Sequence, residues 1–326
     1  MKAVVTGGGG FLGRVIVEFL LAEGFDVWSL SRGRHEELER LGAKTVRCDL
    51  SDELPNLDAC RDADIVYHVA AKAGVFGKAR DYERINVAGT QRVLDACRRF
   101  GVPKLVYTSS PSVCFDGKDH LLASNDLPYA TRFLASYPET KARAERAVLE
   151  ANDASLATCA LRPHLIFGPR DPHLIPRLLE RAKQGRLAIV GDGNNEVSMT
   201  YVENAAAAHL AAGRTLTPTS AHAGRAYFIS QEEPVKLWTW IAEVLAAAGA
   251  PPIRKKLSLR TAYGLGATLE FVWRALRLSG EPPMTRFVAA QLASSHSYTM
   301  DPARRDFGYR ETIDVAEATR RMLASL

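Results

Sequence analysis

Four consecutive glycines, Gly7 to Gly10, stand close to the start of the chain, between an apolar run and a helical pattern. The run Ala3 to Thr6 predicts a strand, and Phe11 to Glu23 predicts a helix. Glycine in such a turn permits positive φ, leaves backbone N–H groups free to approach phosphate oxygens, and lets the helix pack closely on the strand. The beginning of the chain therefore predicts a strand–turn–helix unit that holds the phosphates of a dinucleotide.

The register of this turn stays open at the level of the sequence. Gly8, Gly10 and Gly13 satisfy the spacing GxGxxG, and Gly7, Gly10 and Gly13 satisfy GxxGxxG. A tight turn without a ligand is the alternative reading of any single glycine-rich loop. The placement between a strand and a helix favours the phosphate-binding reading.

Short β-branched runs alternate with helical patterns through the first half of the chain. Apolar residues recur at helical spacing in Asn86 to Phe100, for example. This alternation predicts an α/β fold with a Rossmann-type, doubly wound parallel sheet. The strands are expected at 3–6, 26–30, 45–47, 65–68, 104–108 and 158–161.

The pattern of the sequence changes after Arg162, where prolines cluster and the strict alternation of strand and helix patterns ends. We expect a dinucleotide-binding domain at 1–162, to which the chain returns at about 196–232 through a helix and a strand. Residues 163–326 are then expected to form mainly a smaller, interleaved substrate-binding domain.

Composition excludes several classes of protein. The 42 basic and 37 acidic residues leave a formal charge of +5 without a block of like charge, so no nucleic-acid partner is expected. The five cysteines are scattered and form no CxxC pair, which argues against disulfides and a metal site and favours the cytoplasm. The N-terminus has no pattern typical of a signal peptide, and no apolar run approaches the roughly 20 residues of a membrane span.

The end of the second expected strand carries a signal about the cofactor. A carboxylate at this position bonds the ribose 2′-hydroxyl of NAD, whereas arginine accommodates the 2′-phosphate of NADP. Here the strand runs into Ser31-Arg32-Gly33-Arg34, without an acidic residue. The sequence therefore favours NADP(H), held by Ser31 and by Arg32 or Arg34; a solvated basic loop is the alternative.

Tyr137 and Lys141 stand four residues apart at the start of a helical segment, so their side chains share one face. A nearby ammonium group stabilises phenolate and makes a tyrosine usable as an acid or base. Such a pair also arises by chance on helix surfaces. The strand 104–108, however, ends at Ser109, Ser110 and Ser112, which places hydroxyls at the sheet edge where ligands bind.

These motifs occur together in an order that resembles the extended short-chain dehydrogenases, the group of the 3β-hydroxysteroid dehydrogenases and the sugar-nucleotide epimerases and dehydratases. The resemblance extends over nearly the whole chain, through TGGGGFLG, YTSSPSV, YxxxK, LRPHLIFGP and YVENAAAAHL. It implies that Ser110 is the catalytic hydroxyl, Tyr137 the acid/base and Lys141 its activating lysine. The cofactor-binding residues it implies, together with those reasoned above, are Gly7, Gly10, Phe11, Leu12, Gly13, Ser31, Arg32, Asp49, Leu50, Ala70, Ala71, Asn86, Tyr137, Lys141, Pro163, His164 and Ile166. Without the resemblance, Asp49 would be read as a turn residue and Asn86 as a helix cap.

A narrower resemblance concerns the segments HVAAKAGVFG, YTSSPSVCFDGKDH and YPETKARAERAVL, which are similar to those of the 2-alkyl-3-oxoalkanoate reductases of bacterial long-chain olefin biosynthesis. It implies NADPH-dependent reduction of a β-keto acid with two alkyl chains to the β-hydroxy acid. Dehydrogenases acting on 3β-hydroxysteroids and 4-carboxysterols are the alternative, and a sugar-nucleotide epimerase or dehydratase is a more distant one. A cofactor-sensing protein without activity commonly lacks the tyrosine that this chain has.

Features of the substrate side are less specific. The carboxylate of a β-keto acid needs a cationic or hydrogen-bonding partner, and the candidates are Lys72, His164, Arg170, His173 and Arg177. The amphipathic segment Leu257 to Leu278 is expected to pack on the domain, to line an entrance for alkyl chains, or to contact a membrane or a pathway enzyme. The resemblance further implies a homodimer formed through the helices expected at 86–100 and 137–151.

Overall fold

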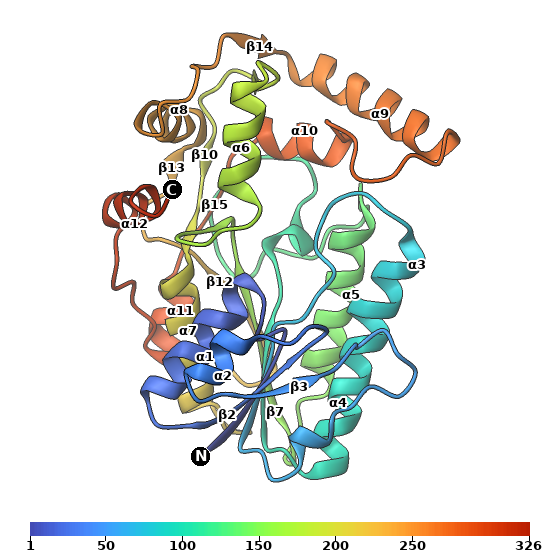
Figure 1. Ribbon diagram of the computed structural model, residues 1–326, viewed down its shortest axis with the longest axis vertical. Coiled ribbons are helices and arrows are strands. Elements are labelled where there is room, and N and C mark those ends of the chain that lie inside the picture. The colour runs from blue at the N-terminus through green and yellow to red at the C-terminus, as the bar shows by residue number, and fades with distance from the viewer.

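A seven-stranded parallel sheet forms the centre of the computed structural model, which describes residues 1–326 (Figure 1). Its strand order is β12-β7-β5-β4-β1-β2-β3, so the order reverses between β1 and β4. This is the doubly wound arrangement that the sequence predicts. The strands are β1 (Lys2–Thr6), β2 (Asp26–Ser31), β3 (Lys44–Arg47), β4 (Ile65–His68), β5 (Lys104–Thr108), β7 (Ala157–Pro163) and β12 (Arg225–Ile229).

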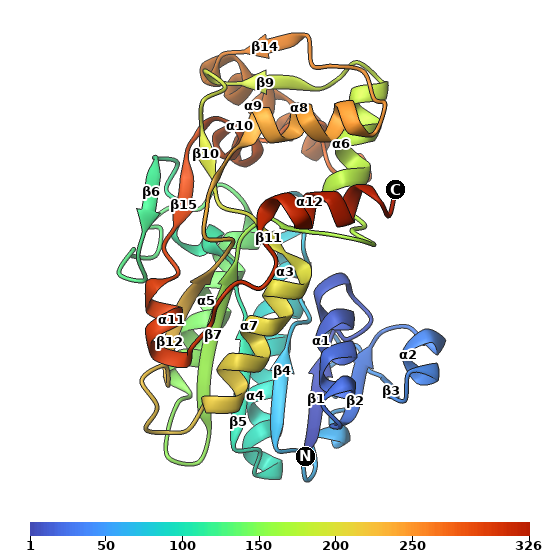
Figure 2. The same ribbon diagram turned by 90° about the vertical axis from the view of Figure 1, so that its left-hand side faces the viewer.

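Helices cover both faces of this sheet (Figures 1 and 2). On one face, α1 (Phe11–Ala22) and α7 (Val202–Thr215) pack together and bury their apolar side chains in the larger core cluster. On the other face, α4 (Gly89–Phe100) and α5 (Ser136–Glu150) contribute to a second core. The short helices α2 (Glu36–Arg40) and η1 (Asp58–Cys60) lie in the connections.

One predicted helix has a different form. The sequence predicts a regular helix from Asn86 to Phe100, but the structure has α3 (Ala79–Tyr82), a π-helix η2 (Glu83–Ala88), and only then α4. A π-helical turn inserts one extra residue into the helix and is frequent at functional sites. Here it brings the buried side chain of Asn86 toward the backbone of Lys72.

The rest of the chain forms a smaller unit over the carboxyl ends of the central strands (Figure 1). It contains the four-stranded sheet β13-β10-β15-β6 and the two-stranded pairs β11-β8 and β14-β9. The strands are β6 (His120–Ala123), β8 (Ile166–Phe167), β9 (Ala188–Val190), β10 (Glu196–Val197), β11 (Thr200–Tyr201), β13 (Val235–Lys236), β14 (Lys255–Leu257) and β15 (His296–Tyr298). The helices of this unit are α6 (Leu174–Lys183), α8 (Leu237–Ala247), α9 (Leu259–Ala275), α10 (Arg286–Ala293) and α12 (Val315–Leu323). Two other elements pack on the larger unit: η3 (Pro111–Cys114) against α5, and α11 (Asp301–Phe307) beside β12 and α7.

The two units exchange segments. Strand β12 pairs with β7 in the central sheet, and α7 covers that sheet, although both follow residue 162. In the other direction, β6 leaves the first half of the chain to pair with β15. We propose the division into 1–162 with 196–232, and the remainder of 163–326, as the functional division of the chain. None of the helices has both the length and the apolar character needed to cross a bilayer.

Candidate active site

The residues expected to form the site follow the carboxyl ends of neighbouring strands. Because all strands of the central sheet are parallel, β1, β2, β4, β5 and β7 end at the same edge, beneath the smaller unit (Figure 1). Ligands bind at this edge in open α/β sheets, near the point where the strand order reverses. The sheet thus brings the glycine turn, the serines of η3 and the start of α5 to one edge.

The glycine turn has no room for side chains. Gly7 has φ +71°, and a Cβ there would lie 2.8 Å from the backbone N and Cα of Ala70. A Cβ at Gly10 or Gly13 would approach the carbonyl oxygen of Gly7, to 3.2 Å and 2.1 Å. Positive φ thus falls at Gly7, and the close helix–strand approach at Gly13, which fits the GxxGxxG spacing. A turn with no room for a Cβ at Gly7 and Gly13, at the N-terminus of α1, fits a pyrophosphate.

Residues at the end of β2 lie beside this turn. The Ser31 hydroxyl accepts a hydrogen bond of 2.9 Å from the backbone N–H of Gly9. The guanidinium of Arg34 donates to Glu39, so its charge is already neutralised. Arg32 is exposed and has no ion pair. Of the two arginines that the sequence offers for a 2′-phosphate, Arg32 is the one with a free guanidinium.

Tyr137 lies in the first turn of α5 and faces Ser110. The Ser110 hydroxyl accepts a hydrogen bond of 2.9 Å from the Ser112 hydroxyl. Burial raises the pKa of Tyr137, and the neighbouring Ser110 side chain opposes this increase. The phenol is therefore protonated at neutral pH and can act as an acid, with Ser110 next to it.

Lys141 is one turn further along the same helix face, and only 2% of it is exposed. Its Nζ donates a 2.6 Å hydrogen bond to the carbonyl oxygen of Thr108 and lies 4.1 Å from the centroid of the Tyr107 ring. Burial lowers the pKa of Lys141 to about 7, against an opposing effect of the Glu145 carboxylate. This ammonium group can therefore lose its charge near neutral pH.

Glu145 extends the stack Tyr137–Lys141 by one more helical turn, and the sequence analysis did not single it out. Its carboxylate accepts hydrogen bonds of 3.0 and 2.6 Å from Arg162 and one of 2.6 Å from the Tyr129 hydroxyl. Both partners of the ion pair are buried. Although burial alone would raise it, the pKa of Glu145 lies below its ordinary value because of Arg162. The i+4 spacing from Lys141 was the available sequence signal.

Asn86 connects two parts of the site. Its Oδ1 accepts from the backbone N–H of Lys72 at 2.7 Å, and its Nδ2 donates to the Lys72 carbonyl and to the Thr140 hydroxyl. The loop after β4 is therefore tied to the helix that carries Tyr137. No helix cap is formed, because Asn86 lies inside η2.

The remaining expected cofactor residues lie along the same edge. Ala70 and Ala71 follow β4, and the Ala70 N–H donates to the Thr6 hydroxyl. Leu50 is buried against Gly89. The Asp49 carboxylate accepts from the backbone N–H of Ser51 at 2.9 Å, which is the geometry of a turn residue.

The segment Pro163 to Ile166 links β7 to β8 across this edge. The His164 imidazole is buried, and its Nε2 lies 2.7 Å from Nδ1 of His296. Burial lowers the pKa of His164 well below its ordinary value, so this ring is neutral. The side chain is thus occupied within the smaller unit, which agrees with a structural histidine.

The other basic residues considered for a substrate carboxylate differ in availability. Arg170 makes two hydrogen bonds to Glu18, and Arg177 pairs with Glu281. His173 is exposed at the start of α6. Lys72 is half-buried and has no carboxylate partner; its Nζ lies 5.2 Å from the centroid of the Tyr82 ring. Of these candidates, Lys72 is the one whose backbone is hydrogen-bonded to Asn86.

Apolar side chains gather beside the start of α5. A small buried cluster contains Phe115, Phe287 and Ala290, with the first two rings edge to face at 5.7 Å. Leu134 and Ala135, immediately before α5, pack against it, together with Val75 and Val288. The approach to Tyr137 therefore has an apolar wall built from both units.

Comparison with known proteins places the chain in a family. Residues 4–259 match the model of the 3-beta hydroxysteroid dehydrogenase/isomerase family. The chain belongs to this family. Its fold is also that of a UDP-glucuronic acid 4-epimerase from Bacillus cereus solved with NAD, with a TM-score of 0.76 at 21% identity over 100% of this chain and 98% of the other.

Two relatives extend over almost the full chain. It is 49% identical to a 2-alkyl-3-oxoalkanoate reductase of Stenotrophomonas maltophilia, covering 100% of this chain and 99% of the relative. It is 34% identical to a sterol-4-alpha-carboxylate 3-dehydrogenase, decarboxylating, of Mus musculus, covering 99% and 90%. Family and fold agree on an extended short-chain dehydrogenase, an oxidoreductase that uses a nicotinamide cofactor.

Proposed function

We propose that this protein reduces a 2-alkyl-3-oxoalkanoic acid to the 2-alkyl-3-hydroxyalkanoic acid, with NADPH as the hydride donor, in long-chain olefin biosynthesis. The observation that carries the proposal is the Ser110–Tyr137–Lys141 constellation beside an apolar wall. The likeness to a reductase of this activity over the full chain supports it.

Three residues of the chain have separate roles in the reduction of a ketone. The bound nicotinamide supplies a hydride to the keto carbon. Ser110 donates a hydrogen bond to the keto oxygen and holds it in place. Tyr137 gives its phenolic proton to that oxygen as the alcohol forms, and the Lys141 ammonium stabilises the resulting phenolate. Lys141 would also hydrogen-bond the ribose next to the nicotinamide when the cofactor is bound.

The dinucleotide is held by the glycine turn and the strand ends. Gly7, Gly10 and Gly13, with the N–H groups of Phe11 and Leu12 at the start of α1, take the pyrophosphate. Asp49 and Leu50 would contact the adenine, Ala70, Ala71 and Asn86 would line the cofactor, and the segment that contains Pro163, His164 and Ile166 would flank the nicotinamide, with the His164 side chain itself bonded to His296. Arg32 and Ser31 take the 2′-phosphate, which gives the preference for NADPH over NADH.

Substrate recognition uses charge at one end and apolar surface at the other. Lys72 binds the carboxylate of the substrate, since its ammonium group has no carboxylate of the protein to satisfy it. The cluster of Phe115, Phe287 and Ala290 contacts an alkyl chain. A sugar nucleotide offers no long alkyl group to such a wall.

A direct assay tests the proposal. NADPH oxidation is followed by its absorbance with a synthetic 2-alkyl-3-keto acid, a 3-ketosteroid and a sugar nucleotide as alternative substrates. Turnover of the keto acid, and its loss in Tyr137→Phe with cofactor binding retained, is expected. Turnover of the ketosteroid alone would establish the second candidate, a sterol dehydrogenase, which the relative of Mus musculus favours.

We further propose a cytoplasmic homodimer. All five cysteines are buried free thiols, as expected in a reducing compartment. Helices α4 and α5 lie side by side on one flank of the sheet and would meet the same pair of a second copy (Figure 1). Analytical ultracentrifugation tests the dimer; a monomer would contradict it.

A further inference from the structure

Exposed apolar side chains concentrate on a single segment far from the glycine turn. Twelve large hydrophobic residues of the chain are exposed, and six of them lie between Leu259 and Leu278. Phe271 is 71% exposed and Leu276 is 66% exposed. Scattered exposed apolar residues are ordinary, but such a concentration marks a contact surface. The six are Leu259, Tyr263, Leu265, Phe271, Leu276 and Leu278.

Helix α9, which carries most of these residues, is attached along one narrow stripe. Its buried residues are Ala262, Gly266 and Glu270, spaced four apart. A Cβ on Gly266 would lie 2.6 Å from the carbonyl carbon of Thr285, so α9 and α10 are in backbone contact there. Glu270 fixes the same stripe through hydrogen bonds to the backbone N–H and guanidinium of Arg286. The helix is therefore firmly placed, and its outer face is free.

The outer face of α9 carries no acidic residue. At 3.6 residues per turn, the positions on the side opposite the buried stripe are Arg260, Thr261, Gly264, Leu265, Thr268, Phe271, Val272 and Ala275. Arg260 stands in the first turn of the helix, Arg274 lies at the border of this face, and Arg277 follows the end of the helix. Long cationic side chains at the border of an apolar face are typical of helices that lie in a membrane interface.

Cations surround this face without matching acids. Residues 254–278 contain six lysines and arginines and a single acidic residue, Glu270, which is buried, is held by Arg286 at 2.8 Å and lies 3.9 Å from the guanidinium of Arg274. The excess of five charges equals the net charge of the entire chain, +5, so the rest of the protein is balanced. A second copy presenting the same cationic surface would be repelled, whereas an anionic surface would be attracted.

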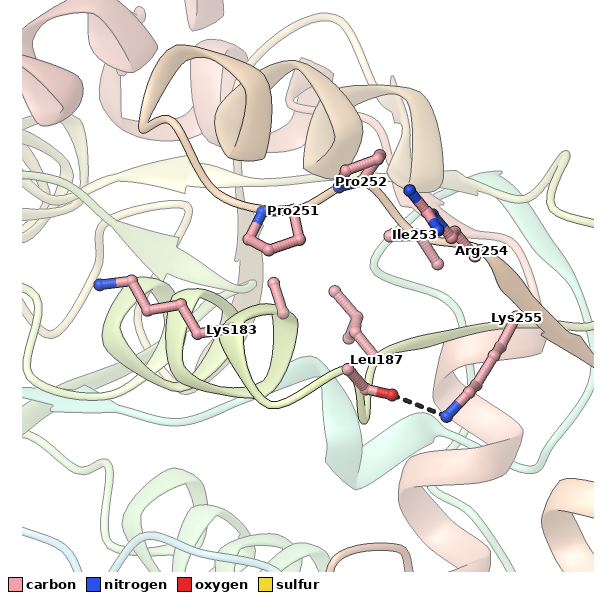
Figure 3. A pocket seen from close by; sticks show the side chains of 9 residues that line it. Lys183, Leu187, Pro251, Pro252, Ile253, Arg254 and Lys255 are labelled. Carbon is pink, nitrogen blue, oxygen red and sulfur yellow. Dashed lines mark hydrogen bonds between the residues drawn. The ribbon is translucent and has the colours of Figure 1, made fainter.

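A cavity of about 350 Å³ at the same end of the molecule adds to this cationic surface (Figure 3). It lies between the end of α6 and the segment leading into β14, and its lining includes Lys183, Arg254 and Lys255 but no acidic residue. The Lys255 ammonium is partly satisfied by the Gly185 carbonyl at 2.7 Å. The cavity therefore adds positive charge to this end of the molecule.

From these observations we propose that the surface formed by α9 and β14 docks the protein on an anionic phospholipid bilayer. The outer face of α9 enters the interface, about 5–10 Å deep, and the surrounding cations meet lipid phosphates. Figure 1 places this surface at the end of the molecule opposite the N-terminus, so docking leaves the glycine turn accessible. The inference does not depend on which ketone is reduced.

Vesicle binding tests the docking. The full-length protein is co-sedimented with vesicles of phosphatidylglycerol and phosphatidylethanolamine, and with vesicles of phosphatidylcholine alone. Binding to the anionic vesicles, weakened at high ionic strength, is expected. The triple variant Leu265→Ser, Phe271→Ser, Leu276→Ser should weaken it by about tenfold or more, and Arg260→Glu, Arg277→Glu likewise.

Matched controls distinguish binding through this surface from nonspecific binding through any exposed apolar residue. Leu54 and Leu121 are 94% and 62% exposed elsewhere, so the variant Leu54→Ser, Leu121→Ser should bind like the parent. Reduction of a short, water-soluble keto substrate should be unchanged in the α9 variants, which shows that they are folded. Absence of binding to anionic vesicles, binding that persists in the α9 variants, or a change of oligomeric state in these variants would each overturn the proposal.

Discussion

The carboxylate of Glu145 accepts two hydrogen bonds from the guanidinium of Arg162, and the Glu145 side chain is entirely out of contact with solvent. Glu145 stands four residues after Lys141 on α5, so a fixed negative charge lies one helical turn from the lysine on the same face of the helix. Among the effects on the pKa of Lys141, burial lowers it and this carboxylate raises it. Glu145 is thus a positioning residue, acting on the proton transfer through Lys141.

Glu145→Gln should change the pH dependence of catalysis. Burial places the pKa of Lys141 at about 7, so the ammonium is lost, and reduction slows, as the pH rises through that value. Removing the carboxylate lowers this pKa further, so the falling limb of kcat/KM against pH should move to lower pH by about one unit. The measurement is kcat/KM for NADPH-dependent reduction from acidic to alkaline pH.

Tyr129→Phe is the control for this experiment, because it removes the 2.6 Å hydrogen bond to Glu145 but keeps the charge. This variant should lose about 1 kcal/mol of stability, and the falling limb of its kcat/KM profile should stay at the same pH as in the parent protein. Glu145→Gln should be less stable by about 3 kcal/mol, because Arg162 stays buried without a carboxylate. An unshifted limb in a folded Glu145→Gln protein would mean that this residue is merely structural.

Gly7→Ala should abolish tight cofactor binding. The new Cβ would lie 2.8 Å from backbone atoms of Ala70, and φ +71° disfavours any side chain. Gly101→Ala is matched in φ, at +68°, but its Cβ would meet nothing within 4 Å. Both variants should lose about 1 kcal/mol of stability from backbone strain, and Gly7→Ala should lose more because its Cβ also meets the backbone of Ala70. Only Gly7→Ala should raise the Kd for NADPH, measured by calorimetry. Equal Kd values for the two variants would refute the proposal that the glycine turn binds the cofactor phosphates.

The central sheet was predictable because its strands are short, β-branched and buried on both faces. The bounds 65–68 and 104–108 were obtained from the sequence as the structure has them. The pairing of Tyr137 with Lys141 followed from helical spacing, and the sheet edge predicted a hydroxyl among Ser109, Ser110 and Ser112, whereas the choice of Ser110 came from the family resemblance alone. Local pattern was sufficient wherever one segment determines its own structure.

Features that depend on distant partners were not predictable. The contact between His164 and His296 joins residues 132 positions apart, and the sequence left His164 open between a ligand and a structural role. The second sheet consists of strands of two to four residues, which are too short to show the alternation of apolar and polar residues that predicts a strand. The π-helix at Asn86 was missed, and the hydrogen bonds of Asn86 within it reach Lys72, a residue outside the helix.

Arg32→Ser should change cofactor preference, whereas Arg34→Ser should not. Arg34 is held by Glu39, but Arg32 has no carboxylate and can meet a 2′-phosphate. Loss of a charge-assisted contact of about 1.5–3 kcal/mol should raise KM for NADPH by about tenfold or more and leave KM for NADH unchanged. If the parent protein uses both cofactors equally, the preference for NADP(H) is wrong.

His68 should make the protein sensitive to acid. Its ring is buried between the hydroxyls of Thr6 and Thr90, at 2.7 and 2.9 Å, and burial lowers its pKa to about 3. Below its ordinary pKa of about 6.5, the unfolded chain binds a proton that the folded chain does not. Stability due to this residue is therefore lost as the pH falls from 6.5 toward 3, by about 2 kcal/mol at pH 5.

Urea unfolding of the parent protein and of His68→Gln, at neutral pH and at about pH 5, isolates this contribution. Glutamine can bond the same two hydroxyls but does not titrate. The variant should be less stable at neutral pH because it packs less well, yet its loss on acidification should be smaller than that of the parent by about 2 kcal/mol. The difference between the two losses removes the effects of carboxylates and other histidines, which are common to both proteins. Equal losses would show that the His68 ring is protonated in the folded state, and a buried imidazolium between two hydroxyls would then have to be explained.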